Sequence, residues 1–234
     1  MGEKLDLRYG IPTEADMEKI NRVSKTQLTS DQVYILGMRL CDNEVDRDFE
    51  RFTTQAIEQL AKMYLGKPGM IDRKIVGRIY ATEVISEPER FTQAGDVYCW
   101  IKAYAYVTRT DAVDELISRL ESREPIEVSI GCTVNICRCS ICGEDITTCG
   151  HVKGNRYLDK LCFGDLKYPL DAYDWAFVVN PKTQKAPATS MKKQIDPVDV
   201  KQAILSGQLE VKVNNGNILL GSTKSGEWVK IGQI

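Results

Sequence analysis

Four residues of the types that bind soft metal ions lie close together in the chain: Cys139, Cys142, Cys149 and His151. A Cys-x2-Cys turn presents two thiolates to one ion, and Gly143 after the second cysteine allows a tight turn. Tetrahedral zinc takes four ligands of this kind, and a closed set leaves no position open for water. The spacing therefore predicts a structural zinc site. Cys162 could replace Cys149 as a ligand, and Cys137 is a further candidate.

A serine upstream of this cluster could act as a nucleophile. Ile126, Val128 and Ile130 alternate with polar or small residues, which is the period of a strand with one buried face. Ser129 therefore points away from the apolar set, next to a glycine that lets another backbone approach closely. The residues alone leave two interpretations open: a catalytic serine, or an ordinary half-exposed strand serine.

The histidine of the cysteine cluster is the only histidine in the sequence. If His151 binds a metal ion, no imidazole remains elsewhere in these 234 residues to move protons. Three further cysteines lie in or beside apolar stretches and are expected to be small buried side chains: Cys41, Cys99 and Cys132.

The composition is that of a globular protein, with 43% hydrophobic and 27% charged residues. The formal net charge of -2 provides no field that would attract nucleic acid or an anionic membrane. No apolar run reaches the ~20 residues that span a bilayer, and no charged-then-apolar leader opens the chain. We therefore expect the protein to be located in the cytoplasm. Because thiols stay reduced there, clustered cysteines are expected to bind metal rather than to form disulfides.

The elements that would position these residues follow from periodicity. A capping residue and an acid at Thr13 and Asp16 predict a helix to about residue 25. Further helices are predicted at 53–65, capped by Thr53 or Thr54, and at 111–122, capped by Asp111. Residues 86–95 are predicted to form a loop. The main strands are predicted at residues 33–41, 76–85, 96–108, 125–136 and 171–180.

The C-terminal part has a different composition. Residues 181–193 contain prolines, lysines and small residues, which is typical of a linker. A short helix at 198–205 and a hairpin about Asn214-Asn-Gly-Asn217 are predicted beyond it. About forty residues are few for an independent domain, so this module is expected to dock on something.

Taken together, the motifs resemble those of the prohead (capsid maturation) proteases of tailed phages, a family with a fold similar to the herpesvirus assemblin proteases. The resemblance covers residues 32–188. It rests on these motifs: Cys41-Asp-Asn-Glu-Val-Asp-Arg-Asp48, Gly66-Lys-Pro-Gly-Met-Ile-Asp72, Val76-Gly-Arg-Ile79, Val128-Ser-Ile-Gly131, the cysteine run and Asp171-Ala-Tyr-Asp-Trp-Ala-Phe177.

This resemblance implies the fold class: α+β, a mostly antiparallel β-barrel flanked by helices, with a zinc-knuckle insertion at residues 137–162. The boundaries that we expect are a helical extension at 1–31, the protease-like core at 32–188, and the linker with a small C-terminal β module at 189–234.

The resemblance also implies a catalytic set. Ser129 occupies the nucleophile position and Asp174 the position of the acid that orients the base. The base, a histidine in the family, is replaced by Arg73. Arginine stays protonated at ordinary pH and cannot accept the serine proton. Arg73 could instead pair with Asp174. The segment after it is shorter than the polar loop of the family, which favours natural loss of the site.

Three hypotheses follow. The first is an inactive pseudo-protease kept as a minor capsid or decoration component in a phage, with capsid protein, scaffold or a second copy as partner. It would be found in the host cytoplasm during assembly and in the virion. The second is an active serine endopeptidase that processes scaffold and capsid precursors, with Lys67, Lys74 or Lys102 as base. The third is a zinc-knuckle interaction or nucleic-acid module, which the acidic balance argues against.

Overall fold

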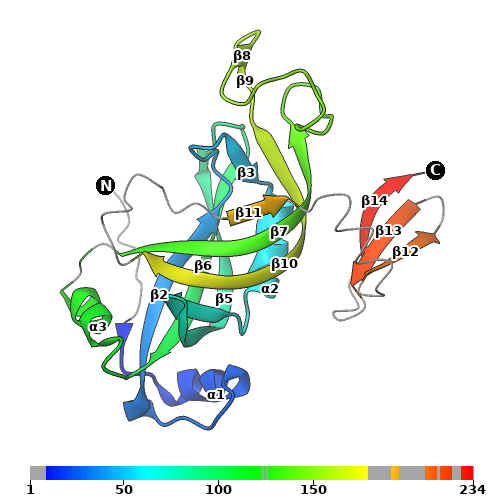
Figure 1. Ribbon diagram of the computed structural model, residues 1–234. Coiled ribbons are helices and arrows are strands. Elements are labelled where there is room, and N and C mark those ends of the chain that lie inside the picture. Colours follow the sequence, from blue (N-terminus) through cyan, green and yellow to red (C-terminus); the bar gives the residue numbers. More distant parts are fainter. Residues whose placement is uncertain are drawn as a thin grey trace.

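The computed structural model describes residues 9–122, 124, 126–178, 191–194, 209–214, 217–222 and 228–233 (Figure 1). Most of the strands belong to one mixed sheet, in the order β1-β2-β6-β5-β4-β10-β7-β11, with β3 also paired to β10. Their bounds are β1 Tyr9–Gly10, β2 Val33–Asp42, β3 Glu50–Phe52, β4 Pro68–Ile71, β5 Lys74–Phe91, β6 Val97–Thr108, β7 Glu127–Cys139, β10 Gly164–Val178 and β11 Met191–Gln194.

The α+β class is confirmed, whereas the expected β-barrel is not, because the described strands form no closed barrel. The strands form an open path from β1 to β11, and no pairing between described residues joins its two ends. Each end is instead covered by its own short strand, β1 along β2 and β11 along β7. Most neighbours are antiparallel, whereas β3 and β4 run parallel to β10 and β11 runs parallel to β7.

The predicted strands are all present, and several are longer than expected. β10 starts at Gly164 rather than at 171, and β7 continues to Cys139, because the two strands pair along almost their whole length. The predicted loop at 86–95 is wrong over its first half. There β5 continues to Phe91, paired with β6, and the Trp100 indole N–H donates to Glu87 at 3.1 Å.

Three α-helices accompany the sheet in the described part of the chain: α1 Glu14–Val23, α2 Thr54–Met63 and α3 Asp114–Glu121. Thr13 and Asp16 form a capping box at the start of α1, as predicted. Thr53 caps α2, and the residue before it, Phe52, belongs to β3. The predicted cap of α3 by Asp111 is wrong, because α3 begins after Val113 without a side-chain cap.

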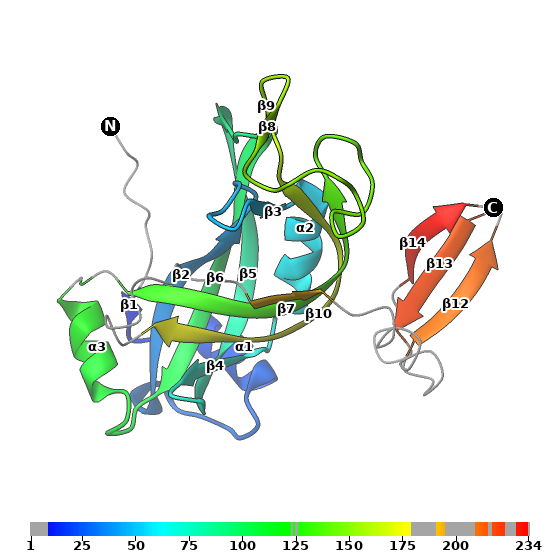
Figure 2. The same ribbon diagram turned by 45° about the horizontal axis from the view of Figure 1, so that its top comes forward.

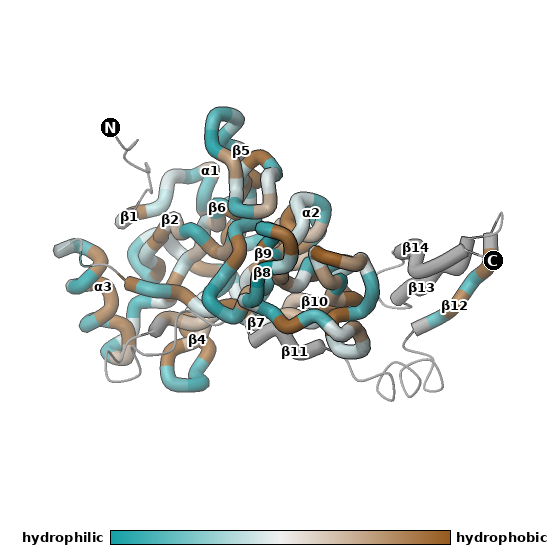
Figure 3. Tube along the Cα trace, turned by 90° about the horizontal axis from the view of Figure 1, so that it is seen from above, coloured by the Kyte–Doolittle hydropathy of each residue, from teal (hydrophilic) through white to brown (hydrophobic). Residues whose placement is uncertain are grey.

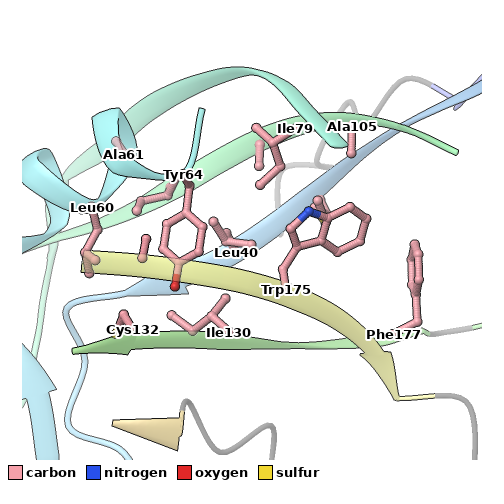
Figure 4. Close-up of a cluster of buried hydrophobic side chains, with 14 of the residues drawn as sticks. Leu40, Leu60, Ala61, Tyr64, Ile79, Ala105, Ile130, Cys132, Trp175 and Phe177 are labelled. Atoms are coloured by element: carbon pink, nitrogen blue, oxygen red, sulfur yellow. The ribbon is translucent and has the colours of Figure 1, made fainter. Parts of the chain in front are cut away.

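The buried side chains form two clusters, one on each face of β2. The larger lies between the sheet and α2 and contains Tyr34, Leu36, Met38 and Leu40 of β2. Figure 4 shows Tyr64 and Trp175 within it on the same side of β7, with Leu40 between them. The smaller cluster, under α1, contains Val33 and Ile35. In Figure 3, hydrophobic and hydrophilic residues alternate along α3, in accord with its buried Leu116, Ile117 and Leu120.

Beyond the sheet, β7 and β10 continue as a two-stranded ladder into a projection that we call the cysteine arm, residues 139–163 (Figure 2). A hairpin of β8 Arg156–Tyr157 and β9 Lys160–Leu161 lies at its tip. Each end of β7 thus carries a different set of candidate functional residues, Ser129 at one end and Cys139 at the other.

The C-terminal residues that the structure describes form a separate antiparallel sheet of β12 Leu209–Asn214, β13 Asn217–Ser222 and β14 Trp228–Gln233. The first two strands pair about the predicted turn, with Asn214 opposite Asn217, and the third adds a strand that the sequence analysis did not separate. The predicted helix at 198–205 lies outside the described residues. Part of the predicted linker, 191–194, is β11.

Candidate metal centre and candidate active site

The first half of the cysteine cluster is a tight turn at the end of β7. The Cys139 N–H donates to the Glu144 carbonyl at 2.8 Å, and the Gly143 N–H donates back to the Cys139 carbonyl at 2.9 Å. The Ile141 N–H points at the Cys139 sulfur at 3.4 Å. Gly143 has φ +77°, a conformation that glycine adopts without strain. This geometry turns the chain so that Cys142 returns beside Cys139.

The second half is a turn organised by Asp145. Its carboxylate accepts hydrogen bonds from the Thr147 N–H and hydroxyl at 2.9 and 2.6 Å, and its carbonyl accepts from the Cys149 N–H at 3.0 Å. His151 then packs edge-on against the Tyr157 ring, with 4.6 Å between the centroids. The arm therefore folds back and brings Cys149 and His151 next to Cys139 and Cys142.

The ligand atoms of Cys139, Cys142, Cys149 and His151 all lie within 4.8 Å of one another, so these four residues are close together and could bind a metal ion. The His151 Nδ1 is buried and has no hydrogen-bond partner among the described residues. A buried imidazole nitrogen without a partner costs free energy unless something binds it. A metal ion held with the three sulfurs would satisfy it, so the donor set fits a cation.

Cys162 lies beside the cluster rather than in it. Its sulfur is 3.9 Å from that of Cys139, and its side chain is fully buried. Burial, and then the contact with Cys139, raise the pKa of Cys162 to about 11. Burial also raises the pKa of Cys139, but donors from Cys142 and Ile141 outweigh it and lower the pKa below its ordinary value. The thiolate therefore forms more readily at Cys139.

At the other end of β7, Ser129 is half-buried and pairs with Ala176 of β10. The next position on the same face of β7 is Gly131, which pairs with Asp174. A Cβ at Gly131 would lie 2.8 Å from the Asp174 Oδ1, so this carboxylate occupies the space that a side chain there would take. Ser129 and Asp174 are thus diagonal neighbours on one face of the sheet, on the order of 7 Å apart.

Arg73 lies elsewhere. It is exposed, and with Asp72 it forms the two-residue turn between β4 and β5, where both residues have positive φ, 48° and 66°. β4 runs parallel to β10 with Met70 opposite Ala176, which carries the turn past the end of β10. Arg73 is therefore about 13 Å along the strands from the level of Asp174. No ion pair between described residues joins Arg73 to Asp174.

The three lysines considered as alternative bases are also accounted for. The Lys67 ammonium pairs with Asp171 at 3.1 Å, beside Thr133 and so four residues along β7 from Ser129. Lys74 is exposed at the β4–β5 turn, and the Lys102 ammonium lies over the Tyr104 ring, 5.3 Å from its centroid. Lys67 is ion-paired, Lys74 is exposed and Lys102 is half-buried, whereas a lysine acts as a base when it is desolvated.

Tyr64, at the C-terminal end of α2, also contacts the strand that carries Ser129. Its hydroxyl points from the core toward the strand that carries Ser129 and donates to the Gly131 carbonyl at 3.0 Å (Figure 4). Burial raises the pKa of Tyr64 well above its ordinary value, with smaller contributions from Cys132, Cys41 and Asp174. The helical spacing indicated that Tyr64 is buried, but the hydroxyl contact depends on long-range packing.

The two candidate sites are separated along β7. Ser129 and Cys139 are ten positions apart on this one strand, which corresponds to roughly 30 Å. His151, held beside Cys139, is therefore too far from Ser129 to accept its proton.

Comparisons with models of known protein families, with curated proteins and with solved structures find no match for this chain. Among the described residues, no helix is both long enough and apolar enough to cross a membrane.

Proposed function

We propose that this protein is a catalytically inactive relative of the tailed-phage prohead proteases, retained as a structural component of the capsid or of its assembly. The partners in this proposal are the major capsid protein or the scaffold, met in the host cytoplasm and kept in the virion. The sequence motifs support the relationship, and the pairing of β7 with β10 supports it further by bringing Ser129 and Asp174 to one face.

The loss of activity is carried by one observation: the single imidazole of the sequence is held in the cysteine arm, roughly 30 Å along β7 from Ser129. The only histidine lies in the cysteine arm, and position 73 holds an exposed arginine in a turn. Removing the base of such a site lowers the rate by on the order of 10⁴–10⁶. A serine hydroxyl without a base is a weak nucleophile.

The second part of the proposal is that the metal ion is Zn²⁺ with a structural role. Three thiolates and one imidazole form a closed tetrahedral set with no position for a substrate or water. In this role the ion holds the turn after β7 and the loop of Cys149 and His151 together. Metal analysis of the purified chain, followed by cobalt substitution to read the tetrahedral geometry from the absorption spectrum, tests this part.

An active serine endopeptidase is the alternative, and the proximity of Ser129 to Asp174 favours it. A fluorophosphonate probe distinguishes the two. We expect no labelling of Ser129 in the wild type, and we expect Arg73→His to remain unlabelled because the new imidazole would lie in the exposed turn. Labelling that disappears in Ser129→Ala would overturn the proposed inactivity.

Mass spectrometry of mature particles from the source phage or prophage tests the structural role. Full-length chain at a copy number near that of the capsid protein is the expected result. Only clipped remnants, found beside processed capsid protein, would point to a working protease and contradict the proposal.

A further inference from the structure

The strand that carries Ser129 has a second neighbour, provided by the chain itself. β11 lies along the side of β7 opposite β10 and runs parallel to β7, with Met191 opposite Gly131 and Gln194 opposite Val134 (Figure 1). Residues 191–193 of β11 belong to the stretch 181–193, for which the composition predicted a linker. A segment without a strand-forming sequence has therefore become the outermost strand of the sheet.

The pairing follows from what β7 would otherwise expose. With β11 in place, Cys132, Thr133 and Val134 are buried, each with at most 1% of the residue exposed. Buried N–H and C=O groups need hydrogen-bond partners, and an unpaired strand edge takes them from any extended segment that fits. Main-chain bonds provide most of the affinity of such strand addition, so the occupant needs little sequence preference. The Met-Lys-Lys-Gln sequence of β11 can therefore pair with β7 although it has no strand pattern.

The connection from β10 to β11 is longer than the distance that it has to span. Val178 pairs with Glu127, and Met191 lies beside Gly131, so the two ends are four levels apart along β7 and on opposite sides of it. This is a span of about 16 Å. The thirteen peptide steps from 178 to 191 reach about 45 Å when extended. The surplus is enough for the same segment to reach the β7 edge of a second molecule.

From this placement we propose that the Gly131–Val134 edge of β7 is a strand-docking site, and that its occupant in assemblies is the 191–194 strand of a second copy of this chain. Exchange of an identical element between copies replaces each intramolecular contact by an equivalent intermolecular one. The proposal is independent of whether Ser129 is catalytic and of which metal the arm binds. It concerns the backbone of β7 alone.

Shortening the connection tests the exchange. Deleting residues 181–190 from the full-length chain leaves three peptide steps, a reach of about 11 Å that is too short for pairing within one molecule but not between two. We expect this variant to be a dimer by light scattering, whereas the wild type is monomeric when dilute. A deletion variant that remains monomeric at high concentration would overturn the proposal.

Proline substitutions provide the matched control. In a strand paired along one side, the N–H groups of consecutive residues point alternately toward and away from the partner. Of Lys192→Pro and Lys193→Pro, one should therefore dissociate the deletion dimer and the other should not, while Lys192→Ala and Lys193→Ala leave it intact. A dimer that is unaffected by both prolines would be held by another surface and would contradict the proposal.

A second measurement covers a deletion variant that fails to fold. A fluorescent peptide of residues 187–198 is added to full-length protein carrying one of the two prolines. Because a tethered strand competes at an effective concentration in the millimolar range, we expect the variant with the vacated edge to bind the peptide at least about ten-fold more tightly than the wild type. If Lys192→Pro, Lys193→Pro and the wild type all bind the peptide equally tightly, the proposal is overturned.

Discussion

The two ends of β7 carry candidate sites that are built in opposite ways. At the Cys139 end, thirteen consecutive residues provide every ligand, and local turns bring the ligand atoms within 4.8 Å. At the Ser129 end, the partners come from β10 and from the β4–β5 turn, and only Asp174 arrives near the serine. A site contained in one segment survives changes elsewhere in the fold. A site assembled from distant strands depends on every turn that positions one of its residues.

The largest expected effect that separates the two ends is on metal binding. Cys142→Ser removes one of the four ligands of the proposed zinc site. Since structural zinc contributes about 10–16 kcal/mol in small zinc-binding peptides, we expect metal content to fall from about one ion per chain to nearly none. Backbone amides of the arm should then exchange rapidly while those near Ser129 stay protected. Elemental analysis and hydrogen exchange measure both.

Cys162→Ser is the control for this prediction. Because Cys162 lies outside the set of four, its loss should leave the metal content unchanged. If Cys162→Ser loses the metal and Cys149→Ser retains it, then Cys162 and not Cys149 is a ligand.

The next effect is on packing at the Ser129 end. Gly69 lies opposite Trp175, and an alanine Cβ there would be 2.2 Å from the buried indole. We expect Gly69→Ala to lower the free energy of unfolding by about 3 kcal/mol, as overpacking of a core does, without changing metal content. Urea unfolding measures this change.

Gly150→Ala is the matched substitution in the arm. A Cβ at Gly150 meets no heavy atom within 4 Å, so its effect on the free energy of unfolding should stay within about 0.5 kcal/mol. Equal destabilisation by Gly69→Ala and Gly150→Ala would remove the contrast between a packed end and an open end.

A smaller effect, with a pH dependence, is expected from Tyr64→Phe. Near neutral pH the lost hydrogen bond to Gly131 should lower the free energy of unfolding by about 1 kcal/mol. The pKa of folded Tyr64 lies above its ordinary value of 10.0, so in more alkaline solution the unfolded chain loses this proton first. The contribution of Tyr64 then falls by about 1.4 kcal/mol per pH unit. The difference between wild type and Tyr64→Phe should shrink and reverse above about pH 10. A constant difference would contradict the buried position of this hydroxyl.

The smallest effect concerns the link between the arm and the sheet. The Lys153 ammonium pairs with Glu50 of β3 at 2.7 Å, in a half-exposed position. A double-mutant cycle with Lys153→Met and Glu50→Gln should give a coupling of about 0.5–1 kcal/mol that weakens as salt is added. A coupling of zero would show that this ion pair does not hold the arm to the sheet.

The features that could be predicted from the sequence are those encoded within a short segment. The capping box at Thr13 and Asp16 marked the start of α1, and the cysteine spacing marked the cluster that the structure assembles. Alternation marked β2, whose two faces are both buried. In each case the residues that make the contact are within about ten positions of one another or repeat along one element.

The features that could not be predicted depend on partners far along the chain. The turn at Asp72 and Arg73 contains neither the glycine nor the asparagine that usually signals two residues with positive φ. Phe52 fits the apolar face of the helix after it, yet it pairs with Leu166 as part of β3. β11 has no strand pattern of its own and exists because the edge of β7 accepts it. The sequence motifs therefore matched position 73 to the base of the family that the chain resembles, but they could not predict where Arg73 lies in the fold.

The burial of β2 on both faces also bears on how the protein unfolds. Its odd positions, such as Val33 and Ile35, lie in the cluster under α1, and its even positions, such as Tyr34 and Leu36, lie in the cluster under α2. A strand shared in this way joins two hydrophobic cores into one cooperative unit, because withdrawing it from either core also removes it from the other. The layer of α1 and the layer of α2 are thus expected to melt in a single transition, with the calorimetric and van't Hoff enthalpies equal.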